Sequence, residues 1–372
     1  MTSIIYVGMD VHTTNYTLCC YSMEDDRFFA EVQVEPDAKN ILKYLARIEK
    51  QQSRGCRIVC GYEAGCLGYS LYHQLHAHGI DCVILAPTTM MTKPCKRIKT
   101  DRRDARLISK CLAFHTYSPV YIPTEVDDAV KEYIRMRDDA NSALARVKQQ
   151  IIAFCIRHGK IHDGKSYWTN KHLEWLSSLD LGNKILSEVL QEYLIRYYQL
   201  REQVDMYDMR INELAQAEPY RQKVEKLGCF RGIAAHTALS FCVEVGDFRR
   251  FATAQQFASY LGLVPGECSS GDKQQYTGIT KAGNSHLRKL LVETAQVFGR
   301  SATKSGKSVA LKERQAKCDS LTVAYADKAN ARLKKKYFKI AMRSKVNIAK
   351  TAVAREMACF IWGMMTDNIS CA

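Results

Sequence analysis

The chain has 372 residues, 54 of them Lys or Arg and 39 of them Asp or Glu, which gives a formal net charge of +15. Its hydrophobic fraction of 47% is typical of globular proteins and excludes wholesale disorder or a fibrous repeat. The length predicts two or three domains, and the positive charge predicts a polyanionic partner such as a nucleic acid.

The first 122 residues alternate strand-like and helix-like patterns. Short runs rich in β-branched and aromatic residues predict strands, and apolar residues at helical spacing predict helices. The predicted strands cover 4–10, 16–22, 28–34, 57–63 and 82–86, and the predicted helices cover 38–49, 67–78 and about 100–115. Three successive strands followed by alternating helices and strands indicate a mixed α/β sheet with a meander on one side.

The middle of the chain, residues 123–216, has a different pattern. The stretches 125–153 and 185–213 are long, charged and free of proline, with Leu and Ile at intervals. They predict two helices that form an antiparallel hairpin or an oligomerisation coil, and their irregular heptads do not fit a strict coiled coil.

The remaining residues return to a compact, mainly helical pattern. Helices are predicted at 220–227, 236–245, 251–261 and 285–299, with a Gly- and Ser-bearing loop over 262–284. Most of the excess charge lies further on, because residues 300–355 hold 16 Lys or Arg and only 3 Asp or Glu. We therefore predict four segments, with boundaries at 1–122, 123–216, 217–299 and 300–372.

The 15 cysteines predict neither disulfides nor zinc. They include no CxxC pair, their number is odd, and many lie in apolar runs where a thiol acts as a small hydrophobe. Cys155, His158 and His162 could share a helix face as metal ligands, but Gly159 and Gly164 interrupt that stretch. No apolar run approaches the ~20 residues of a spanning helix, so we expect a soluble, cytoplasmic protein that does not enter a membrane.

Four carboxylates of the first segment occupy positions suited to a metal site. Asp10 and Glu63 end predicted strands, and Asp101 and Asp104 are three residues apart at a helix start, so they share a face. Carboxylates gathered from distant positions repel one another unless a cation binds, and Mg²⁺ prefers oxygen ligands. Two such ions about 3.5–4 Å apart promote phosphoryl transfer. Taken singly, each acid is more typical of a turn or a helix cap than of a catalytic site, and only the joint pattern favours a metal site.

These stretches resemble a known family. VGMDVH, GYEAGCLGYSL and RIKTDRRDARLISKCL are similar to the Asp-Glu-Asp-Asp set of the insertion-sequence 110 family transposases, which are bridge-RNA-guided serine recombinases. FRRFATAQQFASYLGLVPGECSSGDKQQYTGITKAGNSHLRKLL is similar to that family's C-terminal transposase domain. The resemblance covers roughly residues 4–115 and 220–299. It implies a RuvC-like (RNase H-type) mixed sheet, a coil in the middle and a mainly helical C-terminal domain.

The resemblance also implies roles for individual residues. The implied ligands of Mg²⁺ or Mn²⁺ are Asp10, Glu63, Asp101 and Asp104. Ser270 is the implied nucleophile, and Ser269 beside it is the alternative. No histidine adjoins Ser270 in the sequence, so the metal site is expected to activate its hydroxyl. The family's Pro-Gly-Ile-Gly step is altered here, in KLGCFRGIAAHTAL, which keeps Gly228 and Gly232 but has no proline.

The basic C-terminal region predicts contact with nucleic acid. Lys and Arg that neutralise phosphates give sequence-independent affinity, and aromatic residues interleaved with them, here Tyr337 and Phe338, can stack on unpaired bases. The alternative is a solvated helix face. The predicted binding residues are Lys334, Lys335, Lys336, Lys339, Arg343 and Lys345. No motif for reading base sequence is visible, which suits an enzyme guided by RNA.

Together these features predict a DNA transposase or recombinase. The expected reaction is RNA-guided strand exchange of a mobile element through a Mg²⁺-assisted serine–DNA covalent intermediate. The expected partners are donor and target DNA, a structured bridge RNA and further copies of the chain, as a dimer or tetramer. Two alternatives stay open: a metal-dependent endonuclease or Holliday-junction resolvase that uses water, and a non-catalytic DNA-binding protein.

Overall fold

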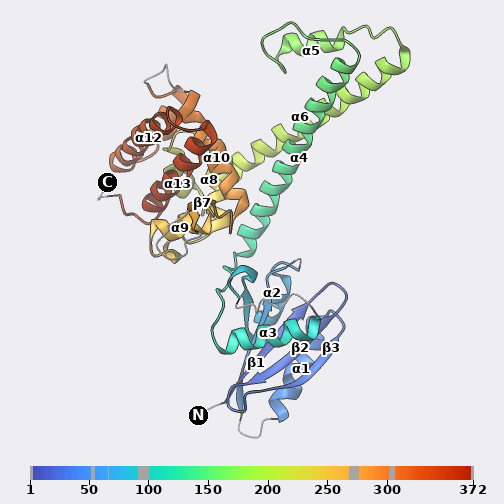
Figure 1. Cartoon of the computed structure of the whole chain (residues 1–372), viewed down its shortest axis with the longest axis vertical. Coiled ribbons are helices and arrows are strands. Elements are labelled where there is room, and N and C mark those ends of the chain that lie inside the picture. The colour runs from blue at the N-terminus through green and yellow to red at the C-terminus, as the bar shows by residue number, and fades with distance from the viewer. Residues whose placement is uncertain are drawn as a thin grey trace. The chain divides into compact units, whose positions relative to one another are not determined.

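The computed structural model describes residues 3–51, 55–65, 67–90, 100–267, 276–300 and 306–369 (Figure 1). The chain divides into two compact units, Met1–Ile122 and Pro123–Ala372. We call the first the sheet unit and the second the helical unit, and each is described by itself.

The sheet unit is built on a five-stranded mixed sheet with the strand order β3-β2-β1-β4-β5. Its elements are β1 (Ser3–Val11), β2 (Tyr16–Ser22), β3 (Arg27–Val34), α1 (Ala38–Gln51), β4 (Cys56–Glu63), α2 (Ser70–Ala77), β5 (Asp81–Leu85), η1 (Pro87–Thr89) and α3 (Asp101–Ala113). The first three strands pair antiparallel, and β4 and β5 add parallel to β1. This topology confirms the predicted mixed α/β sheet with its meander.

The two faces of the sheet carry different side chains of the same strand. In β1, Ile5, Val7 and Met9 are buried in one core together with α1 and α2. Tyr6 faces the other way, into a second core with residues of α3. Since side chains alternate along a strand, the even-numbered residues of β1 face α3.

Two glycines allow α3 to lie directly on the sheet. Gly8 of β1 and Gly61 of β4 are register partners. A methyl group on Gly8 would lie 2.0 Å from the carbonyl oxygen of Ala105, and one on Gly61 would lie 2.8 Å from Leu112 Cδ2. Only glycine permits this approach, so this pair determines where α3 crosses the strands.

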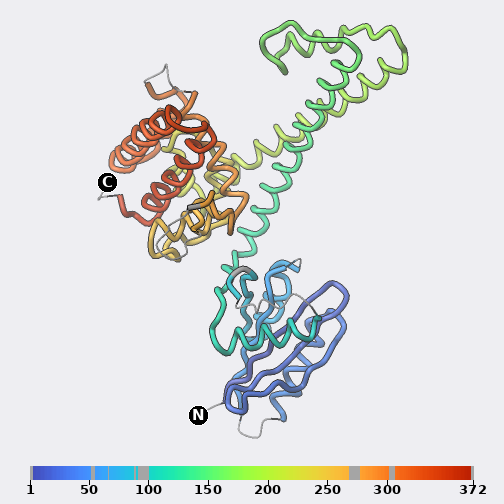
Figure 2. The backbone as a smooth tube through the Cα atoms, viewed as in Figure 1, coloured from blue at the N-terminus to red at the C-terminus, as the bar shows by residue number. Residues whose placement is uncertain are grey.

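The helical unit begins with two long helices. α4 (Glu125–Arg157) and α6 (Lys184–Gln216) have 33 residues each and pack together along a shared apolar cluster, with α5 (Asn170–Ser177) at their far end (Figure 2). This confirms the two predicted helices. The short helix α5 was not predicted, because the glycines around it indicated only a tip loop.

The rest of the helical unit forms one core. Its elements are α7 (Arg221–Gly228), α8 (Ala235–Val245), η2 (Phe248–Arg250), α9 (Ala254–Tyr260), β6 (Pro265–Glu267), β7 (Tyr276–Ile279), α10 (Ser285–Arg300), α11 (Val309–Gln315), α12 (Ser320–Ala341) and α13 (Val346–Met365). The strands β6 and β7 form a small antiparallel pair inside the segment predicted as a loop. Their short, polar sequences carry no strand signal strong enough to detect.

The predicted boundary at residue 300 does not separate two cores. Leu291 and Phe298 of α10 share one buried cluster with Leu333 of α12 and with Val353 and Ile361 of α13. The basic segment is therefore an integral part of this fold, because α12 has an apolar side and α13 is apolar over most of its length.

Two further features of the chain are the state of its cysteines and the apolar character of its helices. Every cysteine in the described ranges is a free thiol, and most are buried. Burial raises the pKa of the Cys242 thiol to about 12, as expected for a packing residue. Among the described residues, we find no helix with the length and apolar character needed to cross a membrane.

Candidate functional site

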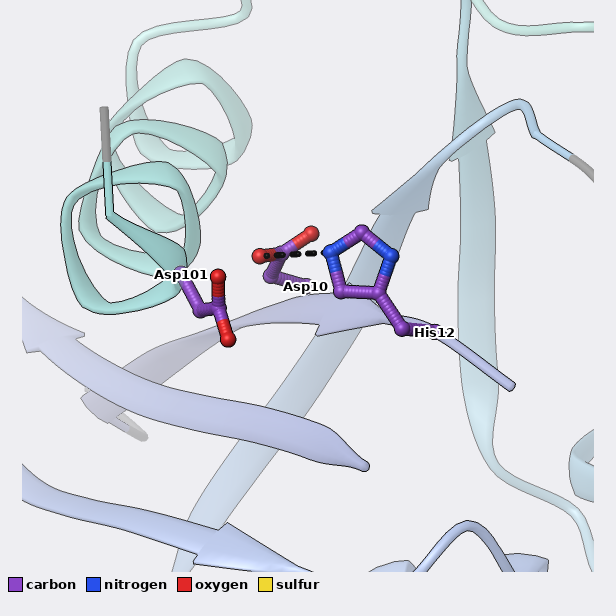
Figure 3. Close-up of side chains that lie close together, drawn as sticks. All are labelled: Asp10, His12 and Asp101. Atoms are coloured by element: carbon purple, nitrogen blue, oxygen red, sulfur yellow. Dashed lines mark ion pairs between the residues drawn. The ribbon is translucent and has the colours of Figure 1, made fainter. Parts of the chain in front are cut away.

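The acidic residues of the sheet unit meet at one end of β1. Asp10 is the even-numbered residue after Gly8, so its side chain faces α3, and Asp101 is the first residue of that helix. Ligand atoms of Asp10, His12 and Asp101 all lie within 4.8 Å of one another. Figure 3 shows the Asp101 carboxylate, from the helix, and the His12 ring, from beyond the strand, on either side of Asp10.

Asp10 is the electrostatic centre of this acid cluster, which we define as Asp10, His12 and Asp101. Its Oδ2 atom is buried and accepts no hydrogen bond from the residues that the structure describes, and His12 Nε2 lies 3.3 Å from it. Burial raises the pKa of the Asp10 carboxyl, and the charges of Asp104 and Asp101 raise it further, against the lowering effect of His12. A buried carboxylate oxygen that accepts no hydrogen bond, next to a second carboxylate and an imidazole, can bind a divalent cation.

The other two predicted acids lie beside the acid cluster. Met9 of β1 pairs with Tyr62 of β4 in parallel register, so Glu63, the next residue, ends its strand beside Asp10 on the same face. Glu63 is exposed. Asp104 lies one helical turn after Asp101 and is close enough to influence the Asp10 carboxyl. The structure thus brings two of the four predicted acids, Asp10 and Asp101, into one cluster, and a shared metal site of all four stays a prediction.

His12 was not predicted as a site residue. It lies two positions after Asp10, so it continues the face on which Asp10 lies. The signal was present in the VGMDVH stretch, but the sequence interpretation treated His12 as part of a change of direction. Its half-exposed ring brings a nitrogen ligand to an otherwise carboxylate set.

Ion pairs orient the helix that supplies Asp101 and Asp104. Arg106 Nε donates to Glu31 Oε2 of β3 at 2.7 Å, and Arg102 Nε lies 3.3 Å from Oε1 of the same carboxylate. Lys110 lies over the rings of Tyr21 and Phe28. These contacts fix the rotation of α3 about its axis, so its two first-turn acids face the end of β1.

The proposed nucleophile and its alternative, Ser270 and Ser269, lie outside the described residues. The strands on either side are described: Pro265 pairs with Ile279, and Glu267 pairs with Tyr276. In the sequence, both serines therefore belong to the connection between β6 and β7.

The predicted nucleic-acid-binding residues differ in exposure. Lys335 and Lys339 of α12 are exposed, as are Arg343 and Lys345 after it, whereas Lys334 is half-buried. Lys336 pairs with Glu356 of α13 inside the unit. Four of the six predicted residues are therefore exposed, and we call these four the basic face, whereas Lys336 has a partner within the helical unit.

The stacking role predicted for Tyr337 is wrong. Its side chain is only 6% exposed and packs in the core of the helical unit, and Phe338 packs partly against the same core. The tyrosine hydroxyl would meet a methyl group on Gly299 at 2.4 Å, which shows how closely the ring fills the space beside α10. Helical periodicity places residue 337 on the apolar side of α12. This position determines its surroundings, although its neighbours in the sequence are basic.

Two segments of the chain match known transposase families. Residues 7–156 match the DEDD transposase family of IS110 elements, described as "Transposase", and residues 225–314 match "Transposase IS116/IS110/IS902 family". The first match contains the acid cluster, and the second contains the β6–β7 pair.

Individual relatives match over most of their length. The putative transposase y4qE of Sinorhizobium fredii (strain NBRC 101917 / NGR234) is 35% identical over 307 residues, covering 82% of this chain and 75% of that protein. The transposase for insertion sequence element IS1533 of Leptospira borgpetersenii is 32% identical over 340 residues, covering 90% of this chain and 95% of that protein. The transposase for IS1111A of Coxiella burnetii is 26% identical over 268 residues, covering 68% and 71%.

Proposed function

Because the chain belongs to the IS110 family of insertion-sequence transposases, we propose that it exchanges DNA strands under RNA guidance through a covalent serine–DNA intermediate. The protein is an enzyme that catalyses DNA strand transfer, and its DEDD domain implies the use of a divalent metal ion. The observation that carries the metal-dependent part of the proposal is the buried Asp10 Oδ2, which lies 3.3 Å from His12 Nε2 and close to Asp101 at the start of α3.

The metal ligands in this proposal are Asp10, Glu63, Asp101 and Asp104, with Mg²⁺ or Mn²⁺ as the ion. When bound, such an ion stabilises charge on phosphoryl oxygens and makes a hydroxyl easier to deprotonate. The chain's own contribution is to hold Asp10 in a partly dry position and to bring the first turn of α3 to it. His12 sits beside Asp10 and limits the repulsion between the carboxylates.

The covalent step assigns Ser270 as nucleophile. Its Oγ forms a bond to the phosphorus of a DNA phosphodiester, the bond from phosphorus to the 3′ oxygen breaks, and the serine proton ends on that leaving oxygen. A 3′-hydroxyl from the partner DNA then attacks the phosphoserine, reforming a phosphodiester and returning a proton to Ser270. One phosphate ester bond replaces another at each stage, so no nucleotide hydrolysis is needed.

The proposed partners follow from charge and shape. Donor and target DNA and a structured guide RNA are polyanions, and the exposed Lys335, Lys339, Arg343 and Lys345 supply a face for phosphates. Strand exchange between two duplexes requires more than one active site, and we assign oligomer formation to α4 and α6.

The test uses a plasmid that carries the insertion element with its flanking DNA, expressed in bacterial cells with the full-length protein. The wild type should form a protease-sensitive DNA–protein adduct and excised element. Ser270→Ala should form neither, while Ser269→Ala should form both. An adduct that persists in Ser270→Ala would overturn the nucleophile assignment. DNA cleavage that persists without any adduct would support the water-using endonuclease or junction resolvase instead.

A further inference from the structure

A second group of charged residues lies inside the helical unit, far along the chain from the acid cluster. Asp138 of α4 accepts a hydrogen bond from His286 Nε2 at 2.8 Å, and its other oxygen lies 2.9 Å from His236 Nε2. Each histidine is the second residue of its helix, α10 and α8 respectively. The Asp138 carboxylate therefore lies at the start of two helices, where their dipoles favour a negative charge.

Glu244, near the end of α8, connects this group to a turn. Its side chain is 6% exposed, and its Oε1 lies 3.2 Å from His286 Nδ1 and 3.2 Å from a guanidinium nitrogen of Arg135. Its Oε2 accepts a hydrogen bond from Asn284 Nδ2 at 2.9 Å. Asn284 precedes α10 and caps it, since its Oδ1 accepts from the Leu287 amide at 3.0 Å.

The turn that contains Asn284, residues 280–284, holds both ends of the β6–β7 pair. The amide of Thr280 donates to Val264 at 2.9 Å, and the amide of Lys281 donates to Gly262 at 3.1 Å. The turn approaches the opposite segment so closely that a methyl group on Gly283 would lie 2.0 Å from the Tyr260 carbonyl oxygen. Residues 260–264 lead into β6 and residues 280–284 follow β7, so the turn clamps the base of the hairpin.

We propose that His286, Glu244 and Asn284 form a positioning network that fixes the 280–284 turn, and thereby the hairpin base, for strand transfer. The inference rests on the proposed function, because Ser270 lies in the sequence between β6 and β7. None of the three residues needs to touch DNA. Each acts by holding the ends of the segment that bears the nucleophile.

The charges in the network balance without a metal ion. Arg137 pairs with both Asp138 and Asp208, and Arg135 pairs with Glu244. Burial by itself lowers the pKa of His286, but its contacts with Asp138 and Glu244 raise that pKa to about 9, so the ring is a cation at neutral pH. The three carboxylates of Asp138, Glu244 and Asp208 are thus matched by one imidazolium and two guanidinium groups, and the two histidines approach opposite oxygens of Asp138.

The experiment measures the turn and the reaction separately. Backbone hydrogen exchange over residues 276–288 is followed in the purified full-length protein, as wild type, His286→Gln and Glu244→Gln. The matched control is Asp327→Asn in α12, which removes the ion pair with Lys307, keeps an oxygen that accepts from Gln315, and has no described contact with the turn. Strand transfer is measured with the same plasmid assay, and binding is measured with the plasmid DNA alone.

Both network variants should exchange at least about tenfold faster at residues 280–284 than the wild type and the control. Their DNA affinity should stay within about twofold, while strand transfer falls about 100-fold, as small misplacements of reacting groups do. In the wild type, this exchange should rise beyond its intrinsic base catalysis as the pH passes about 9, and His286→Gln should lack that step.

Two results would overturn the inference: unchanged exchange over the turn in both variants, or faster exchange with normal strand transfer. Failure of the proposed function is a different result, namely strand transfer that survives Ser270→Ala. The exchange measurements do not depend on that outcome, because they use the protein without DNA.

Discussion

The two units solve the problem of buried carboxylates in opposite ways. Asp10 in the sheet unit has an oxygen without a hydrogen bond, and its pKa is raised by burial and by neighbouring acids. Burial also acts to raise the pKa of Asp138 in the helical unit, but its close contacts with His236, His286 and Arg137 hold it well below its usual range. One oxygen of Asp10 thus lacks a hydrogen bond from the described residues, whereas both oxygens of Asp138 contact a histidine or arginine side chain.

This difference separates a site that needs an external cation from a group that supports the fold. A buried carboxylate without hydrogen-bond donors lowers the stability of the fold until a cation binds it. A buried carboxylate with hydrogen-bond donors and cationic neighbours can stabilise the fold without such a ligand. Removing the carboxylate charge should therefore reduce activity when the residue is Asp10 and reduce stability when it belongs to the ion pairs around Asp138.

The largest effect should come from Asp10→Asn, which should reduce strand transfer by about 10³-fold or more. The raised pKa of Asp10 means that the folded state disfavours its charged form at neutral pH, so the variant should be as stable as the wild type or more stable. Excision assays and calorimetry check both statements, with the exposed Asp25→Asn as control. A marked loss of stability in Asp10→Asn would show that the Asp10 carboxylate stabilises the fold, contrary to the contrast drawn with Asp138.

Gly8→Ala should be the next largest change. Its methyl group would lie 2.0 Å from the Ala105 carbonyl oxygen, so α3 must shift and take Asp101 with it. We expect a loss of about 2–4 kcal/mol in the stability of the sheet unit and a parallel loss of strand transfer. Gly65→Ala has its nearest atom at 3.8 Å and should change the unfolding midpoint little. Equal midpoints for the two variants would show that α3 is not seated as described.

The helical unit should be most stable near pH 5–6. Burial acts to raise the pKa of Glu244, but its partners lower it from 4.5 to about 2, so its contribution is complete above pH 4.5 and is lost as the pH falls toward 2. The pKa of His286 is raised from 6.5 to about 9, so its contribution is complete below pH 6.5 and is lost as the pH rises through 9.

All three tryptophans, at positions 168, 175 and 362, lie in the helical unit, so urea unfolding followed by their fluorescence reports that unit alone. Glu244→Gln should cost roughly 2–3 kcal/mol at neutral pH and much less near pH 2. His286→Gln should remove the decline between pH 6.5 and 9. A wild type with constant stability over that interval would contradict the assigned ion pairing.

The smallest effects should come from the basic face. Lys335→Ala and Lys339→Ala should each weaken DNA binding a few-fold and reduce the slope of log affinity against log salt by about 1. Lys336→Ala should change the salt slope less, because that lysine pairs with Glu356. Filter binding at several salt concentrations measures the slopes, and equal slopes for all three would show that exposure does not decide which lysines contact DNA.

The sequence was most informative where local pattern and burial agree. The strands and the long helices follow from alternation and helical spacing, and the edge position of Asp10 and Glu63 follows from parallel strands ending together. The distance between Asp10 and Asp101 does not, because it depends on the Gly8–Gly61 contact with α3, which joins residues about a hundred positions apart.

Contacts between helices that are distant in the sequence also explain two features that the sequence did not predict. Tyr337 is surrounded by lysines in the sequence but faces the core, because α12 packs on α13. Asp138, Glu244 and His286, which lie together, come from three different helices and form no local sequence motif. Neither feature could be derived without knowing which helices are neighbours.

The length of α4 determines how a movement at its far end would act on the contacts of Asp138. The helix has 33 residues, so it extends about 50 Å at 1.5 Å per residue, and Asp138 lies about 29 Å from the end next to α5. A rotation of about 5° about Asp138 would move that end by about 2.5 Å. A force on that end would therefore act on the contacts of Asp138 with His236 and His286, which oppose such a rotation.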